Sequence, residues 1–140
     1  MIQEQEIPKL VSDLIDAWNT HDISRAVALY APEYEGRDVG EPEPAYGPNG
    51  VHQSLEKYFY GFPDLHFTLE DLIMQGDRFV LHWKAEGTHL GKFMNIPATG
   101  RHVTVQGVTI LETEGNLAKR GWFICDVAGL LRHIGLLPDL

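Results

Sequence analysis

Asp126 is the residue best suited to acid–base chemistry, because it is the single charged residue between Trp122 and Leu131. A carboxylate among apolar neighbours is partly desolvated, and desolvation favours its neutral form. Such a group can exchange protons near neutral pH, as a general acid or base must. Asp is also a favoured N-cap, and a helix is predicted to begin at Val127. The sequence leaves both roles open, and the two can coexist.

Histidines are the other side chains that exchange protons near neutral pH, and the chain contains seven. His66 follows a Phe-Pro-Asp turn at the start of a predicted strand, which makes it the preferred candidate for a catalytic histidine. Strand alternation puts His82 on a polar face. His89 and His102 flank a loop and are expected to be solvated or to form turns. No two histidines are spaced to share a metal ion, so we expect no metal site.

Several other polar and aromatic residues could contact a ligand. Gln106 and Thr109 are polar residues in an apolar predicted strand, where each could donate to a ligand oxygen or face solvent. Trp122 shares a strand face with Asp126 and is either a pocket wall or core. Trp18 lies on the apolar stripe of a helix, and the same two alternatives hold for it.

A helix predicted over residues 49–60 adds Tyr58 and Phe59 to the candidate substrate-binding residues. Tyr34, Tyr46 and Tyr60 could also supply a hydroxyl group near the preceding loop. The sequence does not rank these tyrosines.

The composition is that of one soluble globular domain, residues 1–140. The chain is 44% hydrophobic and 22% charged, and it is long enough to bury a core. Its net charge of −9 disfavours binding to nucleic acid or to an anionic membrane surface.

We expect a cytoplasmic protein. No apolar run reaches the roughly 18 residues of a membrane span, and the N-terminus lacks the apolar core of a signal peptide. Cys125 is the only cysteine and has no partner for an internal disulfide, which fits a reducing compartment.

Apolar residues at helical spacing predict three helices before the sheet, over residues 4–19, 22–30 and 49–60. The first two helices should pack as a hairpin. A short strand over 34–38 separates the second helix from an irregular, proline-rich loop. Loops of this length in a small domain are often lids or pocket walls.

The rest of the chain is predicted to be mainly sheet. Runs rich in aromatic and branched residues predict strands over residues 66–74, 78–87, 102–113 and 117–126, and a short helix over 127–134 ends the chain. Helices followed by long antiparallel strands indicate an α+β domain. If the sheet curls around the helices, the fold is a cone with a cavity for a small molecule.

Six stretches of the sequence together carry a family signature: Phe62–His66, Gly87–Phe93, Ile96–Arg101, Trp122–Asp126, Gly129–Leu131 and Ile134–Gly135. They resemble the SnoaL-like polyketide cyclase family, within the NTF2-like superfamily of α+β cones. The resemblance extends over residues 5–138. It implies a curved antiparallel sheet wrapped around the N-terminal helices.

The resemblance also implies a mechanism. Asp126 would be the acid/base aspartate of an intramolecular aldol condensation that needs neither metal nor cofactor. Elementary chemistry agrees, because such a step needs one base, a partner for the oxyanion and a dry pocket. The resemblance further implies a homodimer or homotetramer.

The chain departs from the family pattern at Arg120, where an acidic residue is frequent, and at Glu112, where a basic one is frequent. Both signs are exchanged, so a cross-strand ion pair of reversed polarity is predicted. Such a pair is more consistent with a structural role than with a catalytic one.

Three functions follow from this sequence. The first is a cofactor-independent cyclase or isomerase acting on a small hydrophobic carbonyl compound. The second is a non-catalytic binder of small molecules, or a protein whose sheet is an interaction surface. The third is an epoxide hydrolase, which needs at least two further polar groups beside Asp126 to hold a water molecule.

Overall fold

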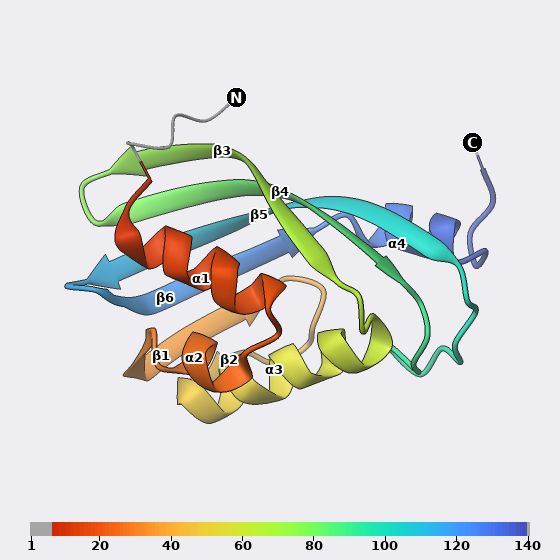
Figure 1. The fold of residues 1–140 in the computed structure, drawn as a ribbon, viewed down its shortest axis with the longest axis horizontal. Helices are drawn as coiled ribbons and strands as arrows, with labels where there is room; N and C mark the ends of the chain where they lie inside the picture. The colour runs from red at the N-terminus through yellow and green to blue at the C-terminus, as the bar shows by residue number, and fades with distance from the viewer. Residues whose placement is uncertain (1–6, 140) are drawn as a thin grey trace.

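The computed structural model describes residues 7–139 as one six-stranded sheet with helices packed against it (Figure 1). The elements in chain order are α1 (Lys9–Asn19), α2 (Ile23–Val27), β1 (Tyr30–Asp38), β2 (Ala45–Tyr46), α3 (Gly47–Gly61), β3 (His66–Gln75), β4 (Arg78–Thr88), β5 (His102–Glu114), β6 (Leu117–Cys125) and α4 (Val127–His133). The sheet curves over α1, α2 and α3, and α4 packs against β5 near the far end of the sheet. The predicted α+β cone is confirmed.

The strand order is β2-β1-β6-β5-β4-β3, and one neighbouring pair differs from the predicted antiparallel sheet. Strands β1 and β6 run parallel, with Glu35 opposite Arg120 and Asp38 opposite Phe123. All other neighbouring pairs are antiparallel. The parallel pairing places Asp38, the last residue of β1, beside Phe123 of β6, where its side chain can reach the interior.

Helices α1 and α2 form the predicted hairpin. Arg25 on α2 pairs with Asp16 on α1 and lies 3.7 Å from Asp13. Helix α2 ends at Val27, although the prediction extended it to residue 30, because Tyr30 already pairs with β6 as the first residue of β1. The predicted start of the first helix lies outside the described residues. None of the described helices is long and apolar enough to cross a membrane.

The proline-rich segment is shorter as a loop than predicted. Ala45 and Tyr46 pair with β1, and α3 begins at Gly47. Pro48 lies in its first turn, where a backbone N–H would have no partner within the helix, so the missing N–H of proline costs nothing. Only residues 39–44 remain irregular.

The two long hairpins have the predicted alternation of faces. On β4, Leu81 and Trp83 are fully buried beneath the helices, whereas His82 points to the opposite, outer face. Gly76 and Gly115 have φ values of 59° and 61°, which glycine adopts without steric cost at these hairpin turns.

Glycines on the inner face of the sheet make room for aromatic rings. A Cβ atom on Gly107 would overlap the Trp83 ring, and one on Gly121 would overlap the Tyr34 hydroxyl group. The rings therefore lie directly on the backbone of β5 and β6, which leaves space between the rings and the helices.

Candidate functional site

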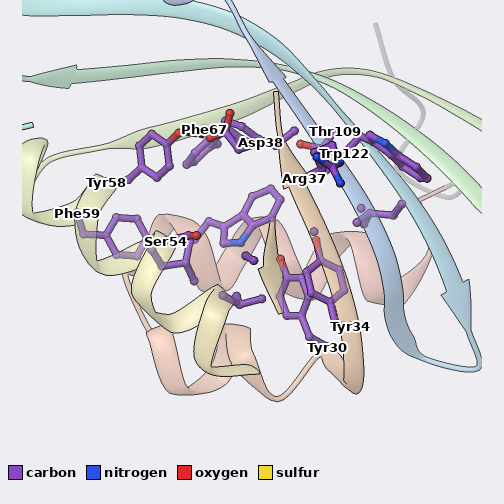
Figure 2. Close-up of a pocket in the computed structure, with 18 of the residues that line it drawn as sticks. Tyr30, Tyr34, Arg37, Asp38, Ser54, Tyr58, Phe59, Phe67, Thr109 and Trp122 are labelled. Carbon is purple, nitrogen blue, oxygen red and sulfur yellow. Dashed lines mark hydrogen bonds between the residues drawn. The ribbon is translucent and has the colours of Figure 1, made fainter. Parts of the chain in front are cut away.

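A cavity of about 120 Å³ lies between the inner face of the sheet and the helices (Figure 2). Its lining residues come from α1, α3 and five of the strands, and most are aromatic or aliphatic. An engineered cavity that binds benzene is roughly this size, about 150 Å³. A smaller cavity of about 40 Å³ lies toward α4 and shares four residues with the first, namely Tyr58, Leu65, Phe67 and Phe123.

Asp38 is the only carboxylate among the described residues that line the larger cavity. As the last residue of β1, it shares the inner face with Tyr34 and Gly36. The Tyr58 hydroxyl group on α3 donates to its Oδ2 at 2.7 Å, and the Gly40 backbone N–H donates to its Oδ1 at 3.0 Å. These two hydrogen bonds orient a carboxylate toward apolar walls.

The Tyr58 hydroxyl group is held in its protonated form. Burial raises the pKa of Tyr58, and the adjacent negative charge of Asp38 raises this pKa further. Tyr58 therefore remains a hydrogen-bond donor to Asp38 over the whole physiological pH range.

The cavity also contains a group of neutral donors, Trp18, Tyr30 and Tyr34, which we call the donor cluster. The two tyrosine rings pack edge to face at 4.7 Å, and their hydroxyl groups point up from the strand (Figure 2). Burial raises the pKa of Tyr34 to about 12 and raises the pKa of Tyr30 as well. The Trp18 indole nitrogen is buried, and its N–H makes no hydrogen bond of normal geometry with the described residues.

The Asn19 side chain fixes the end of α1 to β3, because its amide pairs with a strand backbone as a neighbouring strand would. The Asn19 amide donates to the Phe67 carbonyl at 2.9 Å and accepts from the Phe67 N–H at 2.7 Å. This double hydrogen bond fixes the neighbouring Trp18 against the Phe67 ring, at 5.3 Å between centroids. Ring contacts then continue from Phe67 through Trp83 and Phe123 to Tyr58, so one aromatic series joins the two polar groups of the cavity.

Four of the predicted substrate-binding residues line the larger cavity: Trp18, Tyr58, Phe59 and Trp122. Phe59 is held by His21, whose ring stacks on it at 4.0 Å. Trp122 borders the cavity from β6, but the adjacent Phe123 is the residue whose ring meets the buried Trp83 and therefore faces inward. Ligand contact by these four residues remains a prediction.

Asp126 lies outside both cavities. Strand β6 ends at Cys125, and Asp126 is the N-cap of α4, where its Oδ1 accepts from the Gly129 N–H at 2.9 Å. Its side chain is exposed rather than enclosed by its apolar sequence neighbours, because Phe123 and Cys125 occupy the inward positions. The capping alternative is thus what the geometry displays, and the acid/base role of Asp126 stays a prediction.

His66 and Gln106 also lie away from both cavities. His66 is exposed on β3, where alternation turns Phe67 inward instead. Gln106 is exposed on the outer face of β5, and its Oε1 lies 2.8 Å from His82 Nε2. Its strand neighbour Thr109 faces inward, lines the cavity and accepts a hydrogen bond from Trp83 at 2.9 Å.

The expectation that His89 is solvated was wrong, because this residue is 0% exposed. The loop after β4 folds back on itself, with His89 N–H donating to the Arg101 carbonyl at 2.9 Å and Gly100 N–H donating to the His89 carbonyl at 2.8 Å. Thr99 lies against the ring, with 2.9 Å between Thr99 Oγ1 and His89 Nδ1.

The predicted cross-strand ion pair is confirmed, with 3.5 Å between Arg120 and Glu112.

Sequence reasoning missed Asp38 and Tyr30. Asp38 was placed at the end of a short strand, and alternation from Tyr34 through Gly36 already assigned it to the same face. Nothing in the sequence alone identified that face as the interior. Tyr30 was placed on a helix and therefore not considered with the strand.

In the described part of the chain, Cys125 is not an activated nucleophile, and no set of side chains forms a metal site. Cys125 lines the smaller cavity, where burial first, and then the charges of Asp38 and Asp126, raise the pKa of its thiol to about 11. The thiol is thus protonated at neutral pH. Residues 7–139 contain no group of three or more His, Cys, Asp or Glu side chains placed to hold a metal ion.

Comparison with known proteins gives one family and many similar structures. The model of the SnoaL-like polyketide cyclases matches residues 9–134. TsrD from Streptomyces laurentii is 28% identical, with a TM-score of 0.83 over 98% of this chain and 100% of its own. AclR from Streptomyces galilaeus is 25% identical, with a TM-score of 0.83 over 94% of this chain and 85% of its own.

A Catenulispora acidiphila protein with a ketosteroid isomerase-like fold, solved in complex with trimethylamine, supports the fold. It is 17% identical, with a TM-score of 0.80 over 93% of this chain and 95% of its own. No curated protein sequence matches the chain.

Proposed function

Because the chain belongs to the SnoaL-like polyketide cyclase family, we propose that it is a cofactor-independent cyclase or isomerase of a small hydrophobic carbonyl compound. One observation carries the proposal: a carboxylate, Asp38, is oriented by two hydrogen bonds within an aromatic cavity. A fixed base facing apolar walls is what proton removal from carbon requires.

Asp38 takes a proton from the carbon next to a carbonyl group, and the C–H electron pair becomes an enolate. In a cyclisation, the enolate carbon forms a bond to a second carbonyl carbon of the same molecule. The π electrons of that carbonyl become an alkoxide, which recovers the proton from Asp38. In an isomerisation the proton returns to another carbon. Tyr58 keeps the carboxylate in place throughout.

The test is hydrogen–deuterium exchange at the α-carbons of 2-tetralone in D₂O, followed by NMR. Asp38→Asn retains the shape of the side chain but cannot accept a proton, so we expect the enzyme-dependent exchange rate to fall about 10²- to 10⁴-fold. Asp126→Asn is the matched control, because Asn caps a helix as well as Asp does. We expect it to exchange within a few-fold of the wild-type rate.

The same pair of variants tests the assignment based on sequence. If Asp126→Asn abolishes exchange and Asp38→Asn does not, Asp126 is the acid/base residue and α4 must rearrange to admit substrate. If both variants exchange like the wild type, the carboxylate mechanism is wrong.

A non-catalytic binder is the second candidate, and one observation favours it. Both oxygens of Asp38 already accept hydrogen bonds, from Tyr58 and Gly40, so the carboxylate is satisfied without a substrate. This candidate is supported if the wild-type protein binds 2-tetralone, judged by chemical-shift changes at cavity residues, but does not accelerate hydrogen–deuterium exchange.

An epoxide hydrolase would need two further polar groups beside the acid, and Tyr58 supplies one at Asp38.

We also propose that the outer face of the sheet forms a homodimer or homotetramer interface. Ile124 is 41% exposed there, and Val108, Ile110 and Trp122 share this face. Ile124→Glu should shift the protein toward the monomer in sedimentation-velocity experiments. Leu90→Glu, which changes an exposed leucine in a loop, should not. Equal behaviour of the two variants would locate the interface elsewhere.

The place of action that we propose is the cytoplasm. A single free cysteine, half-buried in the structure, fits a reducing compartment. Cell fractionation with an antibody against the native protein tests this location directly.

A further inference from the structure

The indole N–H of Trp18 is the one buried donor on the cavity wall that the described residues leave unpaired. The side chain is only 6% exposed, so it is more than nine-tenths buried. Buried polar groups in native proteins are almost always hydrogen-bonded, and each exception needs an explanation. A donor that lines a cavity is explained if the cavity receives an acceptor.

The neighbourhood of Trp18 offers a second neutral donor. Tyr30 lies beside Trp18. Burial and the nearby Tyr34 raise the pKa of Tyr30, and the Trp18 indole N–H lowers it slightly, as a donor close to the hydroxyl oxygen does. The indole N–H therefore lies near the Tyr30 hydroxyl oxygen without making a hydrogen bond that meets normal geometry. Two neutral donors side by side suit an uncharged acceptor such as a carbonyl, ether or hydroxyl oxygen.

The position of these donors shows which ligand oxygen they can reach. Tyr30 begins β1 and Asp38 ends it, and β1 is irregular between Tyr30 and Glu35. Opposite the two ends on β6 lie Ala118 and Phe123, only five residues apart, so the ends are roughly 17 Å apart. The carbonyl oxygen of a reacting group is separated from its acidic carbon by only two bonds. An oxygen held by Trp18 and Tyr30, at the start of β1, is consequently a different oxygen from that of the carbonyl group that reacts at Asp38.

We propose that Trp18 and Tyr30 bind a second, uncharged acceptor oxygen of the ligand, remote from the reacting carbon. This inference rests on the proposed function, and it narrows the substrate class to small, largely apolar molecules that carry an acceptor oxygen in addition to the carbonyl group beside the acidic C–H. Binding energy from such a remote group positions the reacting carbon at Asp38.

The test uses two probes of the same shape, acetophenone and α-methylstyrene, in which an oxygen is exchanged for a methylene group. The three indole N–H signals are assigned in ¹⁵N–¹H spectra with Trp18→Phe and Trp83→Phe. Acetophenone should move the Trp18 indole proton downfield, and α-methylstyrene should not. The shift itself is measured on the wild-type protein, and the two substituted chains serve only to assign its signals.

Affinity measurements provide the second half of the test. Trp18→Phe should weaken acetophenone binding about three- to tenfold, the loss of one neutral hydrogen bond, and leave α-methylstyrene within twofold. Trp83→Phe, which removes an indole already paired with Thr109, should leave the ratio of the two affinities unchanged. Urea titration checks that each variant is folded.

Two results would overturn the inference. One is an unmoved Trp18 indole signal when acetophenone is bound, and the other is an equal loss of affinity for both probes in Trp18→Phe. The second result would mean that Trp18 is an apolar wall whose donor is satisfied by water. Neither result depends on turnover, so failure here is distinguishable from failure of the Asp38 exchange test.

Discussion

Trp18 and Trp83 are both buried indoles in contact with the same ring, Phe67, at 5.3 Å on each side, but their N–H groups differ. The Trp83 indole donates to Thr109 Oγ1 at 2.9 Å, whereas that of Trp18 makes no hydrogen bond with the described residues. Burial alone does not separate these two residues. The pairing of the polar atom does, and it distinguishes a side chain that packs from one that can bind.

The largest effect is expected where the Trp83 ring rests on the sheet. Gly107→Ala would place a methyl group in the space of that ring and against the Ile124 carbonyl, so we expect the free energy of unfolding to fall by about 3 kcal/mol. Urea titration followed by circular dichroism measures it. Gly40→Ala is the control, because its Cβ would meet only ordinary contacts, 3.4 Å or longer. An equal loss in both variants would show that ring contact is not the cause.

The hydroxyl groups near Trp18 make stability depend on alkaline pH. The unfolded chain ionises its tyrosines near pH 10, whereas burial raises the pKa of Tyr34 to about 12. The neutral form is thus favoured by folding, and this stabilisation is complete below about pH 10 and lost as the pH rises toward 12. For Tyr34 the loss is on the order of 2–3 kcal/mol.

Unfolding titrations at intervals between pH 8 and 11.5, with phenolate absorbance recorded in parallel, measure this dependence. Tyr34→Phe should flatten it. Complete ionisation of all five tyrosines near pH 10 in the folded protein would contradict the expected burial.

Thr109→Val makes Trp83 resemble Trp18 by removing its acceptor without changing side-chain shape. Leaving a buried donor unpaired should cost about 1–3 kcal/mol of the free energy of unfolding. Trp83→Phe in the same background removes the orphaned donor, so a double-mutant cycle should give a clear coupling energy. Additive effects would mean that the hydrogen bond contributes nothing measurable to stability.

Trp18→Phe should have the smallest effect on stability. It removes a donor that the protein leaves unpaired, so the lost ring area and the relieved polar group oppose each other, and we expect a change within about 1 kcal/mol. Urea titration without ligand measures it. A loss as large as that of Thr109→Val would indicate that Trp18 is held by a partner after all.

The sequence predicted local features well because they depend on local periodicity. The four long strands, the outward position of His82 and the cap at Asp126 all follow from spacing within a few residues. The choice between the two roles of Asp126 required knowledge of where β6 ends relative to the cavity.

The site itself depended on pairings between distant segments. Asp38 reaches the cavity because β1 lies parallel to β6, some eighty residues later in the chain, and no local pattern specifies that neighbour. Gln106 and His66 were reasonable polar candidates, but strand alternation could not say which of two faces the helices would cover. His89 became buried because its loop folds back through Arg101.

The double hydrogen bond of Asn19 has a consequence for solubility. Strand β3 is an outer strand of the sheet, and its unpaired backbone groups could otherwise template a strand from another molecule. Asn19 occupies both groups of Phe67, and His21 Nε2 lies 2.7 Å from the carbonyl of Leu65. The turn after α1 thus blocks edge-to-edge aggregation at the start of β3, without a seventh strand.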